Sequence, residues 1–261
     1  TLTSGRAKVG ASQQSTRPVD FSTPAVFPFE HRTRRYQFLY STPARPLTTV
    51  PPSQCMVRSQ SRLDSVLETF FIDSQNVCFL SELKEEQIAD HLCESPSSVA
   101  FLGQETGRVC PEGISFETRR GCLFIHAGSK VRRKGSKARA GVFIALGPRF
   151  TGLWNTTGKL LSHSMRHVAI ELRLSGHRIC VASAYAPLST SSSRLRSSFC
   201  SELASFASDS TRSVVIGIDS NSSVGAGRHG LAESVGPYNL PHVNAAGRDF
   251  QDFLTTHSLC L

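Results

Sequence analysis

The spacing of apolar residues predicts amphipathic helices in three stretches of the chain. They cover residues 61–75, 191–210 and 246–258. In the first two, apolar side chains recur three or four positions apart, as they do on one face of an α-helix. These positions are Leu63, Val66, Leu67, Phe70, Phe71, Leu195, Phe199, Leu203 and Phe206. The more polar stretch 84–95 is interpreted as a connection or a short helix.

Short apolar runs bounded by polar or glycine residues predict strands. These runs cover residues 76–80, 121–128, 141–146, 167–174, 177–187 and 213–219. Some of the predicted strands are separated by a helix, whereas others follow one another directly. A pure βαβ repeat would alternate strictly, so the pattern predicts an α/β sandwich with mixed sheets.

Residues 1–53 show almost no helical or strand periodicity and are rich in Ser, Thr, Pro, Gln and Arg. Such a composition is typical of disordered segments, because it provides too little apolar surface to bury. We therefore expect a disordered leader at 1–53 and one folded domain at 54–261. The basic stretch at 31–38 (HRTRRYQF) is either a nucleic-acid or targeting patch or a solvated linker.

The composition is basic, with a formal net charge of +9 from 29 Lys and Arg and 20 Asp and Glu. The chain is either simply a basic soluble protein or one with a polyanionic partner, most often nucleic acid. The loop 128–141 (GSKVRRKGSKARAG) concentrates positive side chains among glycines and serines. We expect this loop to bind nucleic acid, with DNA favoured, through Arg132, Arg133, Lys134, Lys137 and Arg139.

The eight cysteines include no C-x-x-C pair, which argues against a zinc ribbon or a thioredoxin-type site. Cys78 and Cys180 lie in apolar runs and are interpreted as small buried side chains in a reducing compartment. The sequence contains no run of about 18 apolar residues, so no membrane helix is predicted, and no secretory signal is visible. We expect an intracellular protein with no membrane partner and no obligate protein partner; a nuclear location fits the charge, but the compartment is left open.

Two glycine-rich stretches imitate nucleotide-binding motifs without meeting their requirements. Residues 225–230 (GAGRHG) match G-x-G-x-x-G, but Gly236 and Pro237 interrupt the helix that would have to follow. Residues 152–160 have the wrong spacing for a P-loop and lack a Ser or Thr after Lys159. Neither stretch predicts a nucleotide site.

Polar residues close three of the apolar runs, namely Glu82, Tyr185, and the pair Asp219 and Asn221. Strand ends are where α/β proteins assemble sites, because rigid elements hold the side chains there and loops admit the substrate. A carboxylate can take a proton from water while a nearby amide donates to a phosphoryl oxygen. A second carboxylate can hold Mg²⁺, which prefers oxygen ligands. Since Asp219 and Asn221 are two residues apart, we expect them to face the same way on an extended chain.

Several motifs resemble those of the endonuclease/exonuclease/phosphatase superfamily. The stretches SAYAP and GIDSNSSVG are similar to its YAP and GDFN signatures, and AGVFIAL and SMRHVAIEL are similar to two of its strands. Residues 236–261 resemble the next segment of the endonuclease domains of non-LTR retrotransposons. The residues that match the motif of that segment are Asn244, Gly247, Phe250, Phe253 and Leu259. The resemblance spans about residues 60–261.

This resemblance implies a four-layered α/β sandwich, in which two mixed β-sheets are flanked by helices. It also implies a phosphodiesterase that uses Mg²⁺ or Mn²⁺ to nick or hydrolyse a nucleic-acid strand, DNA in particular. Carried over by motif, Tyr185 would hydrogen-bond the scissile phosphate. Asp219 would activate or position the water, and Asn221 would help to hold the phosphate.

Two glutamates compete for the role of metal ligand that the resemblance implies. Glu82 follows a predicted strand that a strong amphipathic helix precedes, which is the order that the family shows. Glu105 lies in a literal Gln104-Glu105-Thr106 after another apolar run, but no helix is predicted before that run. The sequence therefore favours Glu82, with Glu105 as the alternative.

Two departures from the family pattern bear on activity. The family carries an asparagine in its first strand, where this chain reads SQCMVRS, with Gln54 as the nearest amide. The family pattern also ends in an Asp–His pair, whose position would lie beyond Leu261 of this chain. These departures imply a domain that is incomplete at its C-terminus, with activity that is impaired. They leave two alternatives open: an inactive remnant that still binds nucleic acid, and a related phosphatase or phosphodiesterase acting on a lipid or a nucleotide.

Overall fold

The computed structural model describes residues 34–41, 67–131, 140–174, 176–225 and 242–259. Contacts divide the chain into Thr1–His31 and Arg32–Leu261, and every described residue lies in the second unit. Among the described residues, none of the helices combines the length and apolar character needed to cross a membrane.

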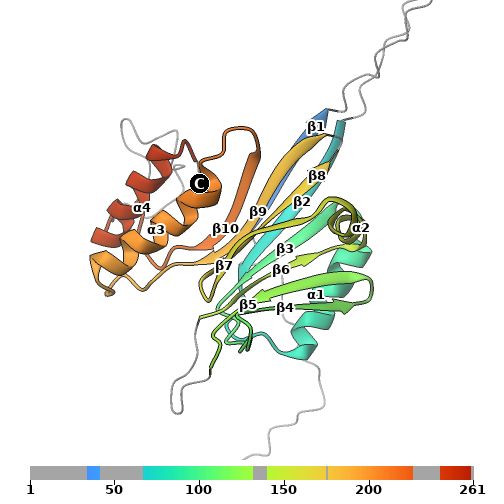
Figure 1. The fold of residues 1–261 in the computed structure, drawn as a ribbon, viewed down its shortest axis with the longest axis horizontal. Helices are drawn as coiled ribbons and strands as arrows, with labels where there is room; N and C mark the ends of the chain where they lie inside the picture. The colour runs from blue at the N-terminus through green and yellow to red at the C-terminus, as the bar shows by residue number, and fades with distance from the viewer. Residues whose placement is uncertain (1–33, 42–66, 132–139, 175, 226–241, 260–261) are drawn as a thin grey trace, which may run out of the picture. The chain divides into compact units, whose positions relative to one another are not determined.

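Two β-sheets form the centre of the described unit (Figure 1). The larger has six strands in the order β1-β2-β3-β6-β5-β4, and the smaller has four in the order β10-β9-β8-β7. Within each sheet one pair is parallel, β2 with β3 and β9 with β10, and the other pairs are antiparallel. The strands are β1 Arg34–Ser41, β2 Leu67–Asn76, β3 Ser98–Gln104, β4 Ile114–Arg119, β5 Cys122–Ala127, β6 Val142–Leu146, β7 Lys159–Ser164, β8 His167–Leu174, β9 His177–Tyr185 and β10 Ser213–Asp219.

Three of the four described helices cover the outer faces of the sheets, whereas Pro148–Thr157 contacts strands of both sheets and packs against the core between them. Those described are α1 Glu82–Glu94, α2 Pro148–Thr157, α3 Ser193–Ala207 and α4 Ala245–Thr256. Helix α1 packs on the six-stranded sheet, whereas α3 and α4 pack on the four-stranded sheet (Figure 1). The order helix, sheet, sheet, helices confirms the predicted four-layered sandwich with mixed sheets.

The main core lies between the two sheets. Phe70 and Ile72 of β2 meet Val181 of β9 and Val215 of β10 in this layer, and Phe150 of α2 joins the same cluster. A second cluster joins the outer face of β8 and β9 to α3 and α4 through Phe199, Leu203, Phe206, Phe250 and Phe253. Burial of these side chains, each worth about 1.5–3 kcal/mol, fixes how the layers stack.

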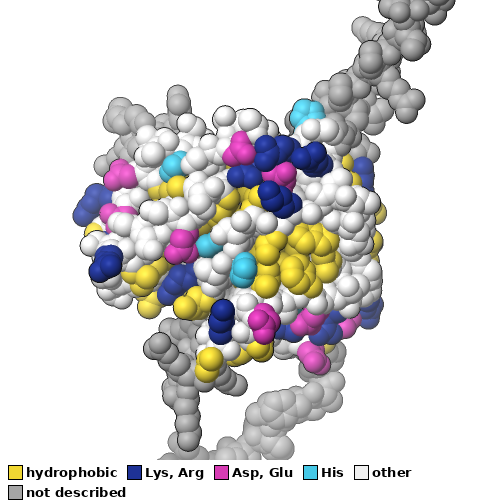
Figure 2. All heavy atoms as spheres, viewed as in Figure 1, with side chains coloured by type: hydrophobic (Ala, Val, Ile, Leu, Met, Phe, Trp, Pro, Cys, Tyr) yellow, Lys and Arg dark blue, Asp and Glu magenta, His cyan; other side chains and the backbone are white. Residues whose placement is uncertain are grey.

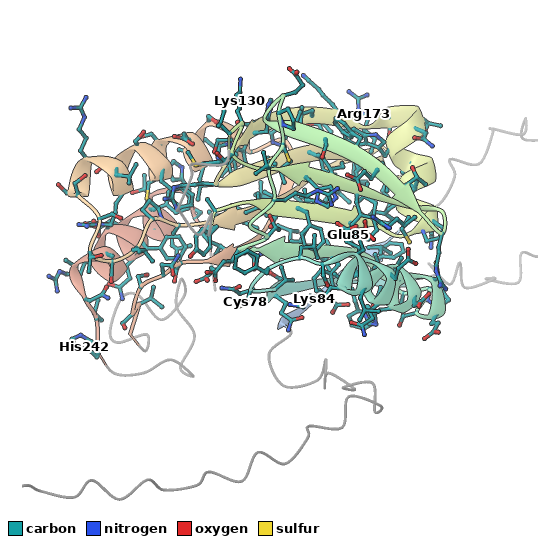
Figure 3. All side chains as sticks on the ribbon, turned by 90° about the horizontal axis from the view of Figure 1, so that it is seen from below. Cys78, Lys84, Glu85, Lys130, Arg173 and His242 are labelled. Carbon is teal, nitrogen blue, oxygen red and sulfur yellow. The ribbon has the colours of Figure 1, made fainter. Side chains whose placement is uncertain are left out.

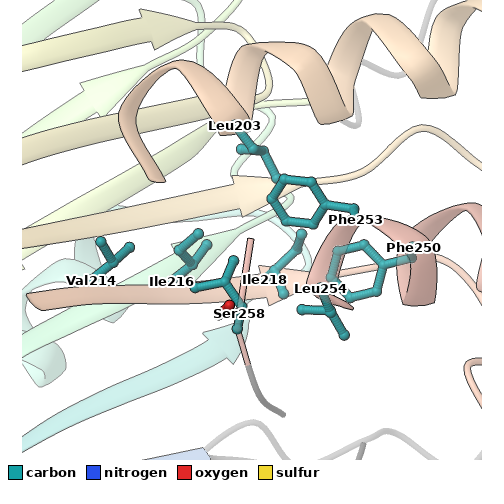
Figure 4. Close-up of a pocket in the computed structure, with 9 residues that line it drawn as sticks. Leu203, Val214, Ile216, Ile218, Phe250, Phe253, Leu254 and Ser258 are labelled. Atoms are coloured by element: carbon teal, nitrogen blue, oxygen red, sulfur yellow. The ribbon is translucent and has the colours of Figure 1, made fainter. Parts of the chain in front are cut away.

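An apolar pocket opens between β10, α3 and α4 (Figure 4). Ser258 is the only polar residue among the described residues that line it. The others are Leu203, Val214, Ile216, Ile218, Phe250, Phe253, Leu254 and Leu259. The pocket therefore offers apolar contact and no group that could perform acid–base chemistry.

The helix predicted at 61–75 is wrong from Leu67 onward, because Leu67–Asn76 forms strand β2. Phe70 and Ile72 face the core between the sheets, while Asp73 accepts hydrogen bonds from Ser98 and His91. Apolar residues at 66, 67, 70 and 71 imitate helical spacing, but pairing with two neighbouring strands decides the structure. The strand predicted at 76–80 is also wrong, since only Asn76 belongs to a strand.

Several elements were not predicted, and one lies in the expected leader. Arg34–Ser41 forms β1 and pairs antiparallel with β2 along its whole length, although the expectation for this stretch was disorder. The helix α1 fulfils the option of a short helix at 84–95 and begins at Glu82, after the N-cap Ser81. Strands β3, β4 and β7 and helix α2 carried no prediction. The other leader residues lie outside the described part of the chain.

Candidate active site

Three polar side chains from separate strand ends meet at one point of the structure. The amide Nδ2 of Asn76 lies 2.9 Å from Oε2 of Glu105 and 2.7 Å from Oδ2 of Asp219. Asn76 ends β2, Glu105 directly follows β3, and Asp219 ends β10. One amide therefore joins two carboxylates that lie far apart in the sequence and on different sheets.

The parallel strand pairs explain why these residues meet. Carboxyl ends of parallel neighbours lie at the same sheet edge, so Asn76 at the end of β2 is paired in register with Gln104 at the end of β3. In the second sheet, Asp219 at the end of β10 is paired with Tyr185 at the end of β9. Stacking of the two sheets then brings both edges together.

Asp219 and Asn221 do not share a face of an extended strand, contrary to the expectation. The strand ends at Asp219, and Asn221 has a left-handed backbone with φ of 47°. The Asn221 backbone N–H donates to Oδ1 of Asp219 at 3.0 Å, so the carboxylate closes a tight turn. The Asn221 side chain donates to the carbonyl of Ala186 at 2.8 Å. The turn thus fixes one carboxylate oxygen while the other faces Asn76.

Tyr185 is 5% exposed and borders the same cluster. Burial is the main cause that raises its pKa, and the nearby carboxylates of Glu105 and Asp219 raise it further. A hydrogen bond with Asn221 and the positive charge of Arg166 oppose this shift. The phenol therefore keeps its proton at neutral pH and can donate a hydrogen bond to an anionic group.

Arg166 brings a positive charge to the side of Tyr185. Its Nη1 lies 3.4 Å from the carbonyl of Tyr185 and 3.3 Å from that of Ala186, and its guanidinium lies 6.0 Å from the centre of the Tyr185 ring. These contacts hold the cation at the end of β9, beside Tyr185, where it could supply counter-charge to a phosphate bound by that residue.

The structure brings Glu105, rather than Glu82, into hydrogen-bond contact with Asn76. Glu82 is exposed in the first turn of α1, where a negative charge stabilises the helix N-terminus. The preference for Glu82 depended on a helix followed by a strand at 61–80, and that order is wrong. Glu105 has φ of 59°, and its carbonyl accepts the Phe79 backbone N–H at 2.8 Å, so the loop after β2 holds it.

Asn76 is the site residue that the sequence reasoning missed. The resemblance of the motifs placed the family's first-strand asparagine in the stretch around Gln54, which lies outside the described residues. A signal was present, because Asn76 follows the apolar residues Phe70, Phe71 and Ile72 in LETFFIDSQN. Interpreting this stretch as a helix concealed that Asn76 closes a strand, as Asp219 does.

The donors at this point fit a hard divalent cation. Glu105 and Asp219 both direct a carboxylate oxygen at the same amide, which places two anionic oxygens close together. Carboxylate oxygens are the ligands that Mg²⁺ and Mn²⁺ prefer, with water completing the shell. The Cys78 thiol lies 3.8 Å from Oε2 of Glu105 and 3.3 Å from Oδ1 of Asn76.

A second group of possible metal ligands lies between α1 and the six-stranded sheet. The ligand atoms of Glu85, Glu117 and His126 lie within 4.8 Å of one another, a spacing compatible with a metal site. Arg108 forms ion pairs with both glutamates, and Arg119 lies 2.7 Å from Glu85. Two guanidinium groups thus already supply positive charge to these carboxylates.

The protonation states in this second group follow from its burial. Burial, with smaller contributions from Arg108 and Arg119, lowers the pKa of His126 to about 3. Burial also raises the pKa of Glu85, which both arginines oppose. Figure 3 shows Glu85 on the side of α1 that faces the sheet. His126 is therefore neutral at physiological pH.

The basic loop residues predicted to bind nucleic acid lie outside the described part of the chain. These residues are Arg132, Arg133, Lys134, Lys137 and Arg139. On the face shown in Figure 2, the Lys and Arg side chains occur in several places, interspersed with Asp and Glu. The role of the loop in nucleic-acid binding therefore stays a prediction.

No protein-family model matches the sequence, and neither does any curated protein. Among solved structures, the chain is similar to the endonuclease domain of TRAS1, a telomere-specific non-LTR retrotransposon. The TM-score is 0.45 and the sequence identity 12%, and the match covers 72% of this chain and 70% of that chain.

Proposed function

We propose that this domain is a metal-dependent phosphodiesterase that nicks a nucleic-acid strand, with DNA as its substrate. The observation that supports this most is the Asn76 amide, which links Glu105 to Asp219 at 2.9 and 2.7 Å. A carboxylate for a metal, a carboxylate for water and neutral donors for a phosphate all lie around this amide. This combination can perform metal-dependent hydrolysis of a phosphodiester.

Glu105 is the residue that we assign to the metal, because its carboxylate lies beside Asp219 and its backbone is held by the loop after β2. When bound, Mg²⁺ or Mn²⁺ would supply positive charge to the phosphate and to the leaving oxygen. Glu105 therefore lies where that charge is needed, and Glu82 is not required for it.

Asp219 is assigned to the attacking water. Its Oδ1 is fixed by the Asn221 backbone N–H at 3.0 Å, and its Oδ2 accepts from Asn76 at 2.7 Å. A carboxylate held at both oxygens is oriented before the substrate arrives, which lowers the entropic cost of aligning the water. Asp219 would accept the proton as the water attacks phosphorus, while the bond between phosphorus and the leaving oxygen of the strand breaks.

Tyr185 and Asn221 are assigned to the phosphate. Tyr185 stays protonated and donates from its phenol to a non-bridging oxygen. Asn221 lies beside it and would be a second neutral donor, exchanging the hydrogen bond that its amide donates to the Ala186 carbonyl for one to the phosphate. Neutral donors stabilise the charge that develops on the phosphate without adding a group that must be deprotonated.

The net charge of +9 supports nucleic acid as the substrate over a small lipid or a nucleotide. A chain that binds a polyphosphate backbone gains from every phosphate that its cations neutralise. The assignment of DNA in place of RNA comes from the resemblance of the sequence motifs alone.

The test is the nicking of supercoiled plasmid by the purified chain with Mg²⁺, with Mn²⁺ and with a chelator. We expect metal-dependent nicking that Asp219→Asn and Glu105→Gln each lower by at least about 100-fold. Glu82→Gln is the matched control and should keep full activity, because it makes the same change at a glutamate outside the cluster. Salt-sensitive DNA binding without nicking in either metal would indicate a binding domain and overturn the proposal.

A further inference from the structure

We infer that Gln104 is a positioning residue, which sets the distance between the two halves of the proposed active site. It is 2% exposed and lies between the two sheets, directly before Glu105. The inference depends on the proposed function, because the distance that it sets is the one between the residues that would perform the cleavage.

The side-chain amide of Gln104 reaches groups from both sheets. Its Nε2 lies 3.2 Å from Oγ of Ser74 on β2 and 3.2 Å from the carbonyl of Leu102 on β3. It also lies 3.2 Å from Oγ of Ser183 on β9 and 3.3 Å from the carbonyl of Gly217 on β10. The two amide protons are thus shared among four oxygens, two from each sheet.

Ser183 adds a second link between the sheets. It is fully buried, and its hydroxyl donates to the carbonyl of Gly103 on β3 at 2.9 Å while it accepts from Gln104. Cores between sheets are otherwise apolar, and a buried polar group is costly unless it is bonded. Here the Gln104 amide and the Ser183 hydroxyl are both hydrogen-bonded. Their contacts with Gly217 and with Gly103 cross between the sheets, so the cluster favours one stacking of the sheets over others.

Each anchor of this cluster precedes a residue of the site on the same strand. Ser74 lies two residues before Asn76, Ser183 two before Tyr185, and Gly217 two before Asp219. Because side chains alternate and a strand rises about 3.3 Å per residue, the cluster lies roughly 7 Å below the site. A change in sheet separation at this level is therefore transmitted to the cluster of Asn76, Glu105 and Asp219.

The close approach of β10 at this level supports the same conclusion. A Cβ on Gly217 would lie 2.5 Å from Oγ of Ser74 and 2.8 Å from Cδ1 of Leu102. Only glycine permits the backbone of β10 to come so near to β2 and β3, and this nearness is what lets Gln104 reach the Gly217 carbonyl.

Gln104→Met and Ser183→Ala test the inference. Gln104→Met keeps the length of the side chain and removes its donor, and Ser183→Ala removes the second link. The matched control is Ser98→Ala, which removes a buried hydroxyl that bonds Asp73 at 3.2 Å near the opposite end of β3. All three variants lose a buried hydrogen bond, but only the first two act between the sheets.

We expect Gln104→Met to lower kcat for plasmid nicking by about 10- to 100-fold, with KM for DNA changed less than about twofold. Ser183→Ala should lower kcat in the same direction, and Ser98→Ala should leave it unchanged at a comparable loss of thermal stability. An unchanged kcat in Gln104→Met, or an equal loss of kcat in Ser98→Ala, would overturn the inference.

A crystal structure of Gln104→Met separates this inference from the proposed function. We expect the Asn76–Asp219 distance, which joins the two sheets, to lengthen while the Asn76–Glu105 distance within one sheet stays the same. If both distances are unchanged, Gln104 does not set the spacing, whether or not the chain cleaves DNA. If the wild-type chain does not nick, the proposed function fails, and this geometric result still decides the inference.

Discussion

Replacing Asn76 with alanine removes the one described side-chain amide that joins Glu105 to Asp219. Hydrogen bonds to charged groups contribute about 1.5–3 kcal/mol each when well formed. Both bonds here are only partly buried, so water replaces some of the lost interaction. We therefore expect Asn76→Ala to lower the free energy of unfolding by about 2 kcal/mol in the absence of metal, measured by urea denaturation.

Asn76→Asp is the sharper variant, because it places a third carboxylate within hydrogen-bond distance of two others. Like charges raise the pKa of the new group in the folded state above its unfolded value near 4. The loss of stability relative to wild type should therefore be small below about pH 4 and grow as the pH rises. Saturating Mg²⁺ should recover part of it, since a cation relieves the repulsion.

The same pair of variants tests the catalytic assignment. A catalytic group misplaced by about 1 Å can cost about 100-fold in rate, so nicking by Asn76→Ala should fall by about that factor. If Asn76→Ala changed stability by less than about 0.5 kcal/mol and nicked plasmid as fast as wild type, the Asn76 amide could not be the link between the two carboxylates.

Three further predictions follow from other parts of the structure. Gly217→Ala should destabilise the fold by about 1–3 kcal/mol, because its Cβ would overlap Ser74. Gly152→Ala, in helix α2 with open space around it, should stabilise the fold by about 0.5–1 kcal/mol. Urea denaturation of both variants checks this. The pKa of His126 is about 3 in the folded chain and about 6.5 in the unfolded chain, so only the unfolded state takes up a proton between pH 7 and pH 5. The free energy of unfolding should therefore fall by about 2 kcal/mol as the pH is lowered from 7 to 5. His126→Gln should flatten this dependence, and parallel pH profiles of variant and wild type would contradict it. Glu85→Ala should cost about 1–3 kcal/mol in urea denaturation, since Arg108 and Arg119 would lose their buried partner and keep only the more exposed Glu117 and Glu86. A chelator should leave the wild-type urea midpoint unchanged, and a midpoint that drops with the chelator would indicate a structural metal at Glu85, Glu117 and His126.

Local pattern was sufficient for the elements whose apolar residues follow one period over enough residues. Helix α3 and strands β5, β6, β8, β9 and β10 lie within or close to the predicted stretches. In these elements the intrinsic pattern and the tertiary environment agree. The same apolar runs placed Tyr185 and Asp219 at the ends of strands and Asn221 just after one, as the structure has them.

Strand β2 shows where local pattern fails. Its apolar residues suit either a helix or a strand, and the choice is made by β1 on one side and β3 on the other. This one error removed Asn76 from consideration and favoured Glu82 over Glu105. Strand β1 has the same dependence, because a short run in a polar segment gains its hydrogen bonds only from a partner.

By itself the sequence determined the sandwich class and the residue types available for phosphodiester chemistry, because periodicity and composition are local properties. Only the tertiary structure decided which glutamate accompanies Asp219, because Asn76, Glu105 and Asp219 come from different strands. Their meeting depends on parallel pairing within each sheet and on the polar contacts of Gln104 between the sheets. The spacing of apolar residues along one strand does not reveal such long-range contacts, because the partner residues lie on other strands, far away in the sequence.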